Sequence, residues 1–246
     1  MRGAGRILVL LIILAAAPLA QGEPGAPTLD AAARVDYGWL TGDAAMIDAA
    51  RDSLENQRSD PWAAYLRAYA SYRASQLALA GGRPAGSSLE QCNREASQAV
   101  ASQGVAAESE LIAAEAELII AACAALSAVA EPLRAVLHQR RFRQALGRAA
   151  SLDGDNPRFA LIRLRYADPS ELTVEAVVEA FRARRGRYGF PDWGEAEALV
   201  LLGAERLDAG DRRGARDLIE EALLIAPDYT EAKALARRLA AQTAAN

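Results

Sequence analysis

Apolar residues recur at intervals of three and four along the C-terminal part of the chain, as they do on one face of a helix. Within residues 195–208 these positions include Leu199 and Leu202, beside the small residue Gly203. We expect a helix here, with its apolar face directed into a core. We expect it to end at Gly210, because glycine readily takes the left-handed conformation that ends helices.

A second helix is expected after Asp211, whose side chain can cap its first turn. Ala215 and Ile219 lie on its apolar face, and Pro227 stops it before a third helix that runs through Leu239. Because the facing positions of the first two helices hold small residues, the two can pack closely.

This stretch resembles a tetratricopeptide repeat, whose pattern runs W-x2-L-G-x2-Y, A-x3-F and P over about 34 residues. Residues 196–229 span one unit without an insertion, although three of the family's aromatic positions hold other side chains. The corresponding positions are Leu199, Leu202, Gly203, Arg206, Ala215, Ile219 and Pro227. The C-terminal part also resembles repeat proteins exported to the bacterial periplasm.

The resemblance implies antiparallel helix pairs that stack into a right-handed superhelix and bind partners on its inner face. In this repeat the inner positions would be Glu197, Val200, Ala204 and Asp208. Repeats of this family that clamp a C-terminal carboxylate have Lys and Asn where this chain has Val200 and Ala204, which argues against that ligand for this repeat.

The rest of the chain divides into helices by periodicity and by turn residues. The expected ranges are 29–41, 44–58, a helix from 61, 88–102, 106–126, 132–151, 156–166 and 174–185. We therefore predict an all-α protein: a right-handed superhelical solenoid of about five antiparallel helix pairs plus a C-terminal capping helix, in one domain over 29–246. One range has a conflict, because Leu133, Val136 and Leu137 lie nearly opposite Phe142 and Leu146, and we expect a break near residues 139–141.

The first 22 residues are typical of a signal peptide. Arg2 and Arg6 precede an apolar run, and small residues around Ala20 offer a cleavage site. The alternative is a membrane anchor, but residues 7–20 would reach only about 21 Å as a helix, short of a hydrocarbon core of ~30 Å. We expect cleavage, a periplasmic location, no membrane-spanning segment in the mature chain, and a flexible lead-in over 23–28.

Cys92 and Cys123 are the two cysteines of the chain. Export would place them in an oxidising compartment. A hairpin hinged near Gln103 and Gly104 puts Cys92 opposite Glu117, about 9 Å along the helix axis from Cys123. A disulfide needs Cα atoms within about 7 Å, so both a disulfide and two buried thiols stay open.

Composition agrees with a helical fold, since 52% of the 246 residues are hydrophobic but only 6% are aromatic, leaving alanine and leucine to pack the core. The net charge is −4, yet residues 132–187 hold 12 basic and 6 acidic residues. These arginines either pair with acidic neighbours inside the molecule or form a patch for an anionic peptide, lipid or glycan. The candidate partner-binding residues are Arg140, Arg141, Arg158 and Arg165. We expect no nucleic-acid partner, because few aromatic residues are free to stack bases.

Catalytic patterns are not evident. His138 is the single histidine, and no CxxC, GxSxG or phosphate-loop motif occurs. We expect Glu115 and Glu117 to point to different sides of a helix as solvated carboxylates, and not to form an acid–base pair. The sequence therefore predicts no catalytic residue, cofactor or metal.

The first functional hypothesis is an exported, non-enzymatic scaffold that binds protein partners on the concave face of the solenoid. The alternative is a small-ligand-binding accessory subunit of an uptake or envelope-assembly system. In a third hypothesis, the basic segment contacts lipid or peptidoglycan, and reversing the charges of Arg140 and Arg141 abolishes a salt-sensitive interaction.

Overall fold

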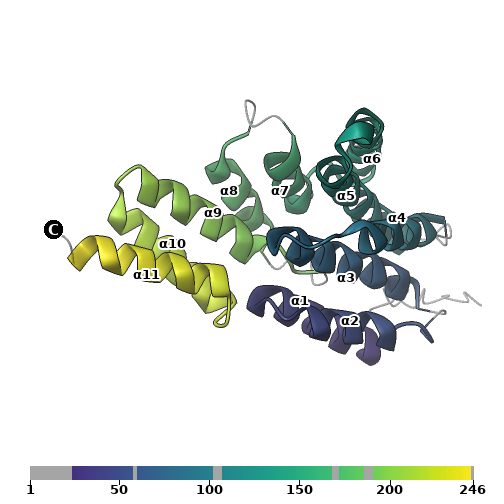
Figure 1. Cartoon of the computed structure of the whole chain (residues 1–246), viewed down its shortest axis with the longest axis horizontal. Helices are drawn as coiled ribbons and strands as arrows, with labels where there is room; N and C mark the ends of the chain where they lie inside the picture. Colours follow the sequence, from purple (N-terminus) through teal and green to yellow (C-terminus); the bar gives the residue numbers. More distant parts are fainter. Residues whose placement is uncertain (1–23, 58–59, 102–106, 168–171, 186–190, 245–246) are drawn as a thin grey trace, which may run out of the picture.

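The computed structural model describes residues 24–57, 60–101, 107–167, 172–185 and 191–244. Helices account for nearly all of these residues, and the described part contains no strand (Figure 1). The predicted all-α class is confirmed. The expected signal peptide, 1–22, and the expected hinge at Gln103 and Gly104 lie outside the described residues.

Eleven α-helices and one 3-10 turn follow one another through the described residues. Their bounds are α1 Ala26–Thr41, α2 Ala44–Ser53, α3 Pro61–Ala80, α4 Gly86–Ala101, α5 Ala107–Ala130, η1 Pro132–Arg134, α6 Ala135–Asp153, α7 Pro157–Tyr166, α8 Val174–Arg184, α9 Glu195–Asp208, α10 Arg212–Ile225 and α11 Thr230–Ala244. Consecutive helices pack against each other, and α1, α3, α5 and α7 also contact one another in sequence order. The first and last described helices contact each other, and the Thr230 hydroxyl at the start of α11 donates to the Leu40 carbonyl near the end of α1 at 3.0 Å.

Several helices begin where a polar side chain caps free backbone N–H groups, as the sequence predicts. Asp60 accepts from the Trp62 N–H at 2.9 Å. Asp211 accepts from the Gly214 N–H at 2.9 Å, after a Gly210 whose φ of 83° is left-handed. The predicted bounds of the helix over 195–208 are therefore confirmed.

The helix predicted over 132–151 was expected to break, and this expectation is wrong. After the short turn η1, α6 runs without interruption from Ala135 to Asp153. Phe142 is buried, whereas Leu133, Val136 and Leu137 are exposed. The conflict in the pattern therefore comes from apolar residues facing solvent and not from a change in the helix.

The interior is built around α3 and α5. Helix α3 is buried on nearly every side, and Ala-rich α5 lies between α4 and α6. Among the described helices, only α5 is long and apolar enough to cross a membrane, over Glu110–Ala130, and 78% of its most apolar window is buried. Burial on this scale is what the central helix of a helical core requires.

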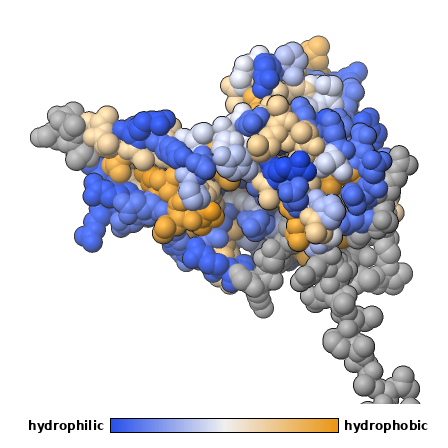
Figure 2. Space-filling view, turned by 90° about the horizontal axis from the view of Figure 1, so that it is seen from below, coloured by the Kyte–Doolittle hydropathy of each residue, from blue (hydrophilic) through white to orange (hydrophobic). Residues whose placement is uncertain are grey.

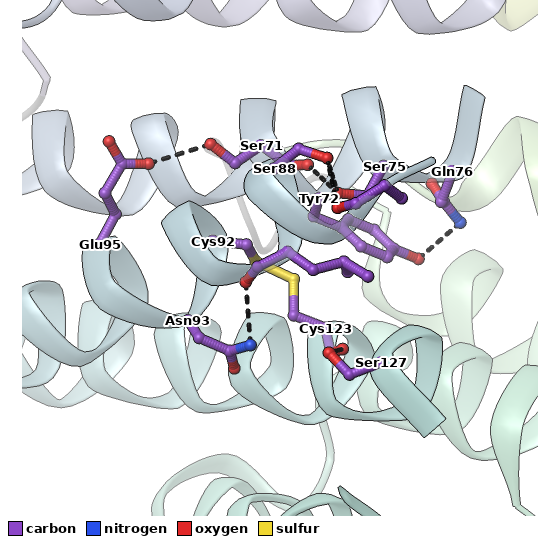
Figure 3. The surroundings of a disulfide bond; sticks show 12 residues. Ser71, Tyr72, Ser75, Gln76, Ser88, Cys92, Asn93, Glu95, Cys123 and Ser127 are labelled. Atoms are coloured by element: carbon purple, nitrogen blue, oxygen red, sulfur yellow. Dashed lines mark hydrogen bonds between the residues drawn. A yellow bond between two sulfur atoms is a disulfide. The ribbon is translucent and has the colours of Figure 1, made fainter. Parts of the chain in front are cut away.

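A disulfide joins Cys92 of α4 to Cys123 of α5, with their Cα atoms 6.5 Å apart (Figure 3). A symmetric hairpin hinged near Gln103 would place Cys92 opposite Glu117. The structure places it beside Cys123 instead, six residues or about 9 Å farther along α5. Hydrogen bonds from Ser71 to Glu95 at 3.0 Å and between Ser75 and Ser88 at 2.8 Å join α3 to α4 beside the bond.

At the other end of the molecule, a groove of about 500 Å³ runs between α10 and α11 and is lined by Ile219, Leu223 and Leu239. Apolar side chains gather over this end on the side seen in Figure 2. The groove lies apart from the polar interior described next.

Candidate functional site

A row of polar and aromatic side chains lines one side of α3. Tyr65, Tyr69, Tyr72 and Arg73 are buried, and their spacing of three and four residues places them along the same side of the helix. Trp193, which lies two residues before the start of α9, also belongs to this cluster. Its ring stacks on that of Tyr69, with ring centroids 5.4 Å apart. The cluster thus joins two helices that are far apart in the sequence.

Arg73 is the centre of the cluster, and it is fully buried. Its guanidinium pairs with Glu197 of α9 and donates to the Tyr69 hydroxyl at 3.0 Å. The same group lies 4.5 Å from the ring centre of Trp39 and 4.9 Å from that of Trp193. Ion pair and ring contacts together fix the guanidinium in place.

Glu197 is shared between two arginines. Arg165 of α7 approaches it at 2.9 Å, in addition to Arg73. Burial would raise the pKa of Glu197, but the charges of Arg73 and Arg165 outweigh burial and hold this pKa below its usual value. The carboxylate is therefore ionised inside the protein, and α3, α7 and α9 are joined through it.

A second buried ion pair lies next to the first. Arg158 of α7 donates to Glu115 of α5 at 2.6 Å, and Asn156 donates to the same carboxylate oxygen at 2.6 Å. The Trp193 indole donates to the Tyr65 hydroxyl at 2.9 Å, and that hydroxyl lies 3.4 Å from Glu115. The two ion pairs are therefore linked through Trp193, whose ring lies 4.9 Å from the Arg73 guanidinium and 5.7 Å from that of Arg158.

The expectation that Glu115 and Glu117 are solvated acids is wrong. Both carboxylates are buried, and Glu117 accepts two hydrogen bonds from Arg148 of α6, at 2.6 and 2.8 Å. The expectation rested on helix spacing alone. It did not take into account that arginines of α6 and α7 pair with these carboxylates and so make their burial possible.

A pocket of about 380 Å³ opens beside Arg73, between α1, α3, the start of α9 and the end of α10. Trp39, Tyr69, Arg73 and Trp193 form its inner wall. Apolar side chains such as Leu29, Leu40 and Ile225 complete the lining. We call this cavity the Asp36 pocket, after the carboxylate that α1 contributes to it.

Two carboxylates line the Asp36 pocket without a cationic partner in the part of the chain that the structure describes. Asp36 is partly exposed and Asp192 is exposed, and neither forms an ion pair with another described residue. The Tyr69 hydroxyl donates to Asp36 at 2.6 Å. Burial raises the pKa of Asp36 to about 7, although this hydrogen bond and the charge of Arg73 oppose the shift. A positive charge entering the pocket would be attracted by both acids and would restore the ordinary acidity of Asp36.

This arrangement is suited to binding. The cavity combines aromatic and apolar walls with a few polar groups, as small-molecule sites do. No described group of three or more His, Cys, Asp and Glu side chains is placed to hold a metal ion. The unpaired acids make a compact organic cation the best match to the pocket.

The four arginines proposed from the sequence do not share one surface. Arg158 is buried in its pair with Glu115, and most of the Arg165 side chain is covered beside Glu197. Arg140 and Arg141 are exposed on α6 and form no ion pair with another described residue. Many other arginines of the basic segment pair with acids of the flanking segments, as internal neutralisation requires. These pairs are Arg148–Glu117, Arg182–Glu221 and Arg185–Glu195.

The inner positions expected in the last repeat are also largely covered. Glu197 and Val200 are buried, Ala204 is partly buried, and Asp208 is exposed and bonded to Arg238. The expectation that Glu197 and Val200 line an open concave face is wrong, because both are buried and Glu197 is enclosed by Arg73 of α3 and Arg165 of α7.

Sequence reasoning did not identify the Asp36 pocket. A signal was present in the range 62–72, which holds four of the chain's 14 aromatic residues. Such a density in an aromatic-poor chain indicates a specialised helix, but its partners Asp36 and Trp193 lie too far away in sequence to be assigned from spacing.

No family model, curated protein or solved structure matches the chain.

Proposed function

We propose that this chain is an exported, non-enzymatic binding protein that holds a small organic cation in the Asp36 pocket. One observation carries the proposal: Asp36 and Asp192 form no ion pair with any described residue, and they lie at a pocket walled by Trp39, Tyr69 and Trp193. An ammonium group would find two carboxylates and aromatic surface at the same place. The buried pair of Arg73 and Glu197 holds the inner wall rigid, so little ordering is needed on binding.

The scaffold for this pocket is proposed to be a tetratricopeptide-like right-handed superhelix of five antiparallel helix pairs, closed by the capping helix α11. The spacing of residues 196–229 supports this arrangement, as do the contacts between consecutive helices. The disulfide supports export, because such bonds persist in oxidising compartments. A mature N-terminus near residue 21 in a periplasmic fraction would establish the location, and an intact N-terminus in the cytosol would contradict it.

Protein partners on a concave face are less well supported as the main function. Glu197 and Val200 are buried, and the pocket volume of about 380 Å³ suits a small molecule. A role as the accessory subunit of an uptake or envelope-assembly system agrees with the pocket.

The test compares choline with its neutral isostere 3,3-dimethylbutanol, by thermal shift and by calorimetry. We expect choline to raise the melting temperature of the mature chain, because binding to the native state alone stabilises it. Short primary amines extend the panel to ligands with smaller head groups.

Variants locate the binding. Asp36→Asn should weaken choline binding by about tenfold, whereas Asp30→Asn, which removes the same charge from an exposed position on α1, should not. If no cation of the panel stabilises the chain, or if the neutral isostere stabilises it equally, the proposal is wrong.

A further inference from the structure

Four large apolar side chains stand exposed where α5 turns into α6. They are Val129, Leu133, Val136 and Leu137, with exposed fractions of 68%, 103%, 77% and 66%. Farther along the same helix, Phe142, Ala145 and Ala149 face the core and are buried. Val136 and Leu137 therefore lie on a second apolar side of α6, which Leu133 of η1 and Val129 of α5 extend, and the described part of the chain does not cover it.

This apolar surface projects from the molecule and does not form a pocket. Leu133 is as exposed as an isolated residue, so no neighbouring atom covers it and it projects from the molecule. Val136 and Leu137 follow at spacings of three and four residues, which places all three on one side of the turn. A projecting apolar ridge is suited to insertion into the acyl-chain region at the surface of a lipid bilayer.

The charges around the ridge are positive. Arg134, Arg140, Arg141 and Arg143 are exposed, and Glu131 is the single acidic residue between positions 129 and 143. Glu131 is itself engaged by Arg134 at 3.6 Å and lies 3.5 Å from His138. We define the α5–α6 tip as this ridge together with Arg134, Arg140 and Arg141.

We propose that the α5–α6 tip docks the protein on an anionic phospholipid surface, with its leucines in the interfacial layer and its arginines among the headgroups. Apolar insertion combined with several basic residues is the pairing that gives stable peripheral binding. A protein groove would also accept leucines, but the excess of exposed arginines matches a uniformly anionic surface. Figure 1 shows α5 and α6 at one end of the molecule, away from α1, α10 and α11, so docking leaves the Asp36 pocket open.

The test is sedimentation of the mature chain with phosphatidylcholine vesicles, with and without phosphatidylglycerol, at low and high salt. We expect binding to the anionic vesicles at low salt and much weaker binding at high salt or to phosphatidylcholine alone, because surface charges are screened by salt.

Two matched pairs of variants locate the contact. Leu133→Ser should lower vesicle binding by about tenfold, as expected for loss of one inserted leucine, while Leu224→Ser, at an exposed leucine on α10, should leave it unchanged. Reversing Arg140 and Arg141 to glutamate should lower binding by roughly 25-fold or more. The same reversal at the exposed pair Arg212 and Arg213 should have little effect.

Circular dichroism and melting temperature show whether each variant is folded. The proposal is overturned if the chain does not bind anionic vesicles, or if tip and control variants bind equally. It is also overturned if the chain self-associates in ultracentrifugation and Leu133→Ser abolishes this association without affecting vesicle binding, since the tip would then join two copies of the chain.

Discussion

At the scale of single residues, the unusual feature is a set of ionised side chains held away from water. Arg73, Glu197, Glu115 and Arg158 are all nearly or fully buried, and each is matched by an opposite charge. Removing one partner of such a pair leaves a buried charge without compensation, which costs far more than the intact pair contributes.

Glu197→Gln tests this cost most directly. Arg73 and Arg165 would then face each other without the carboxylate that both contact, and we expect a loss of about 3–5 kcal/mol in the free energy of unfolding. Urea titration followed by circular dichroism measures it. Glu205→Gln, on an exposed side of the same helix, should change stability by less than about 0.5 kcal/mol. Equal effects of the two substitutions would contradict the buried pair.

Asp36 should make stability depend on pH. Its pKa is raised from 3.8 to about 7, so the folded state holds a proton that the unfolded state has lost between about pH 4 and 7. Stability therefore falls as pH rises through this window, and the penalty is complete above it. Asp36→Asn removes the penalty.

We expect this variant to be more stable than the parent by about 2 kcal/mol at pH 8, after allowance for the partial exposure of the side chain, and equal to it below pH 4. Melting curves across the range measure the difference, with Asp30→Asn as the control, which removes only an exposed pair with Arg34 and should change stability by less than about 0.5 kcal/mol. A variant no more stable than the parent at pH 8 would refute a raised pKa.

At the scale of elements, the helices could be predicted well from the sequence, because their determinants are local. Asp60, Thr173 and Asp211 cap helices that begin at residues 61, 174 and 212, where the sequence predicts them. The prediction from apolar periodicity assumes that every apolar residue of a helix faces the core. This assumption is wrong for α6, which has apolar residues on an exposed side as well as on its buried side, and the two sides together looked like a broken helix. Periodicity shows that residues share a side, but not which side the rest of the chain covers.

Two helix-packing glycines should differ in their tolerance of a methyl group. A Cβ at Gly38 would lie 2.8 Å from the Ile47 side chain and 2.9 Å from the Asp43 carbonyl, where α1 packs on α2. At Gly203 the nearest atom, from Ile219, would be 3.4 Å away. We expect Gly38→Ala to cost about 1–3 kcal/mol. Gly203→Ala should be close to neutral, since alanine favours the helix.

Thermal unfolding of the two alanine variants measures the difference. If Gly38→Ala proves as harmless as Gly203→Ala, the close approach of α1 and α2 is incorrect. Gly203→Leu is the larger probe of the α9–α10 packing, and it should destabilise the chain because the leucine would displace Ile219 and Leu235.

The disulfide between α4 and α5 should contribute a separate share of stability. It closes a loop with a sequence separation of 31 residues, for which chain entropy gives about 3–4 kcal/mol. Reductant should therefore lower the melting temperature of the parent by roughly 10 °C. A variant with Cys92→Ala and Cys123→Ala should melt lower and no longer respond to reductant. A parent that melts at the same temperature with and without reductant would contradict this contribution.

At the scale of the whole molecule, sequence reasoning could not reach the site, because its residues come together only through the long-range fold. Asp36, Arg73 and Trp193 belong to three separate helical regions, and nothing in the spacing of any one of them indicates the other two. The excess of basic residues over 132–187 was visible in the sequence, and so were its two possible explanations, internal pairing with acids and a patch for an anionic partner. Internal pairing accounts for arginines such as Arg148 and Arg158, while Arg140 and Arg141 stay exposed.

The same long-range contacts distinguish this molecule from an open array, in which each repeat contacts only its neighbours and stability is nearly a sum of local terms. Here Arg73 pairs with Glu197, 124 residues later, and Trp193 bonds to Tyr65. Breaking the first contact with Glu197→Gln should therefore speed amide hydrogen exchange in α3 as well as in α9, relative to Glu205→Gln. Exchange that rises only from α9 to α11 would mean that the two halves unfold independently. The rigid inner wall that the Asp36 pocket requires would then be lost, because α3 supplies Tyr69 and Arg73 to that wall and Trp193 comes from the residues directly before α9.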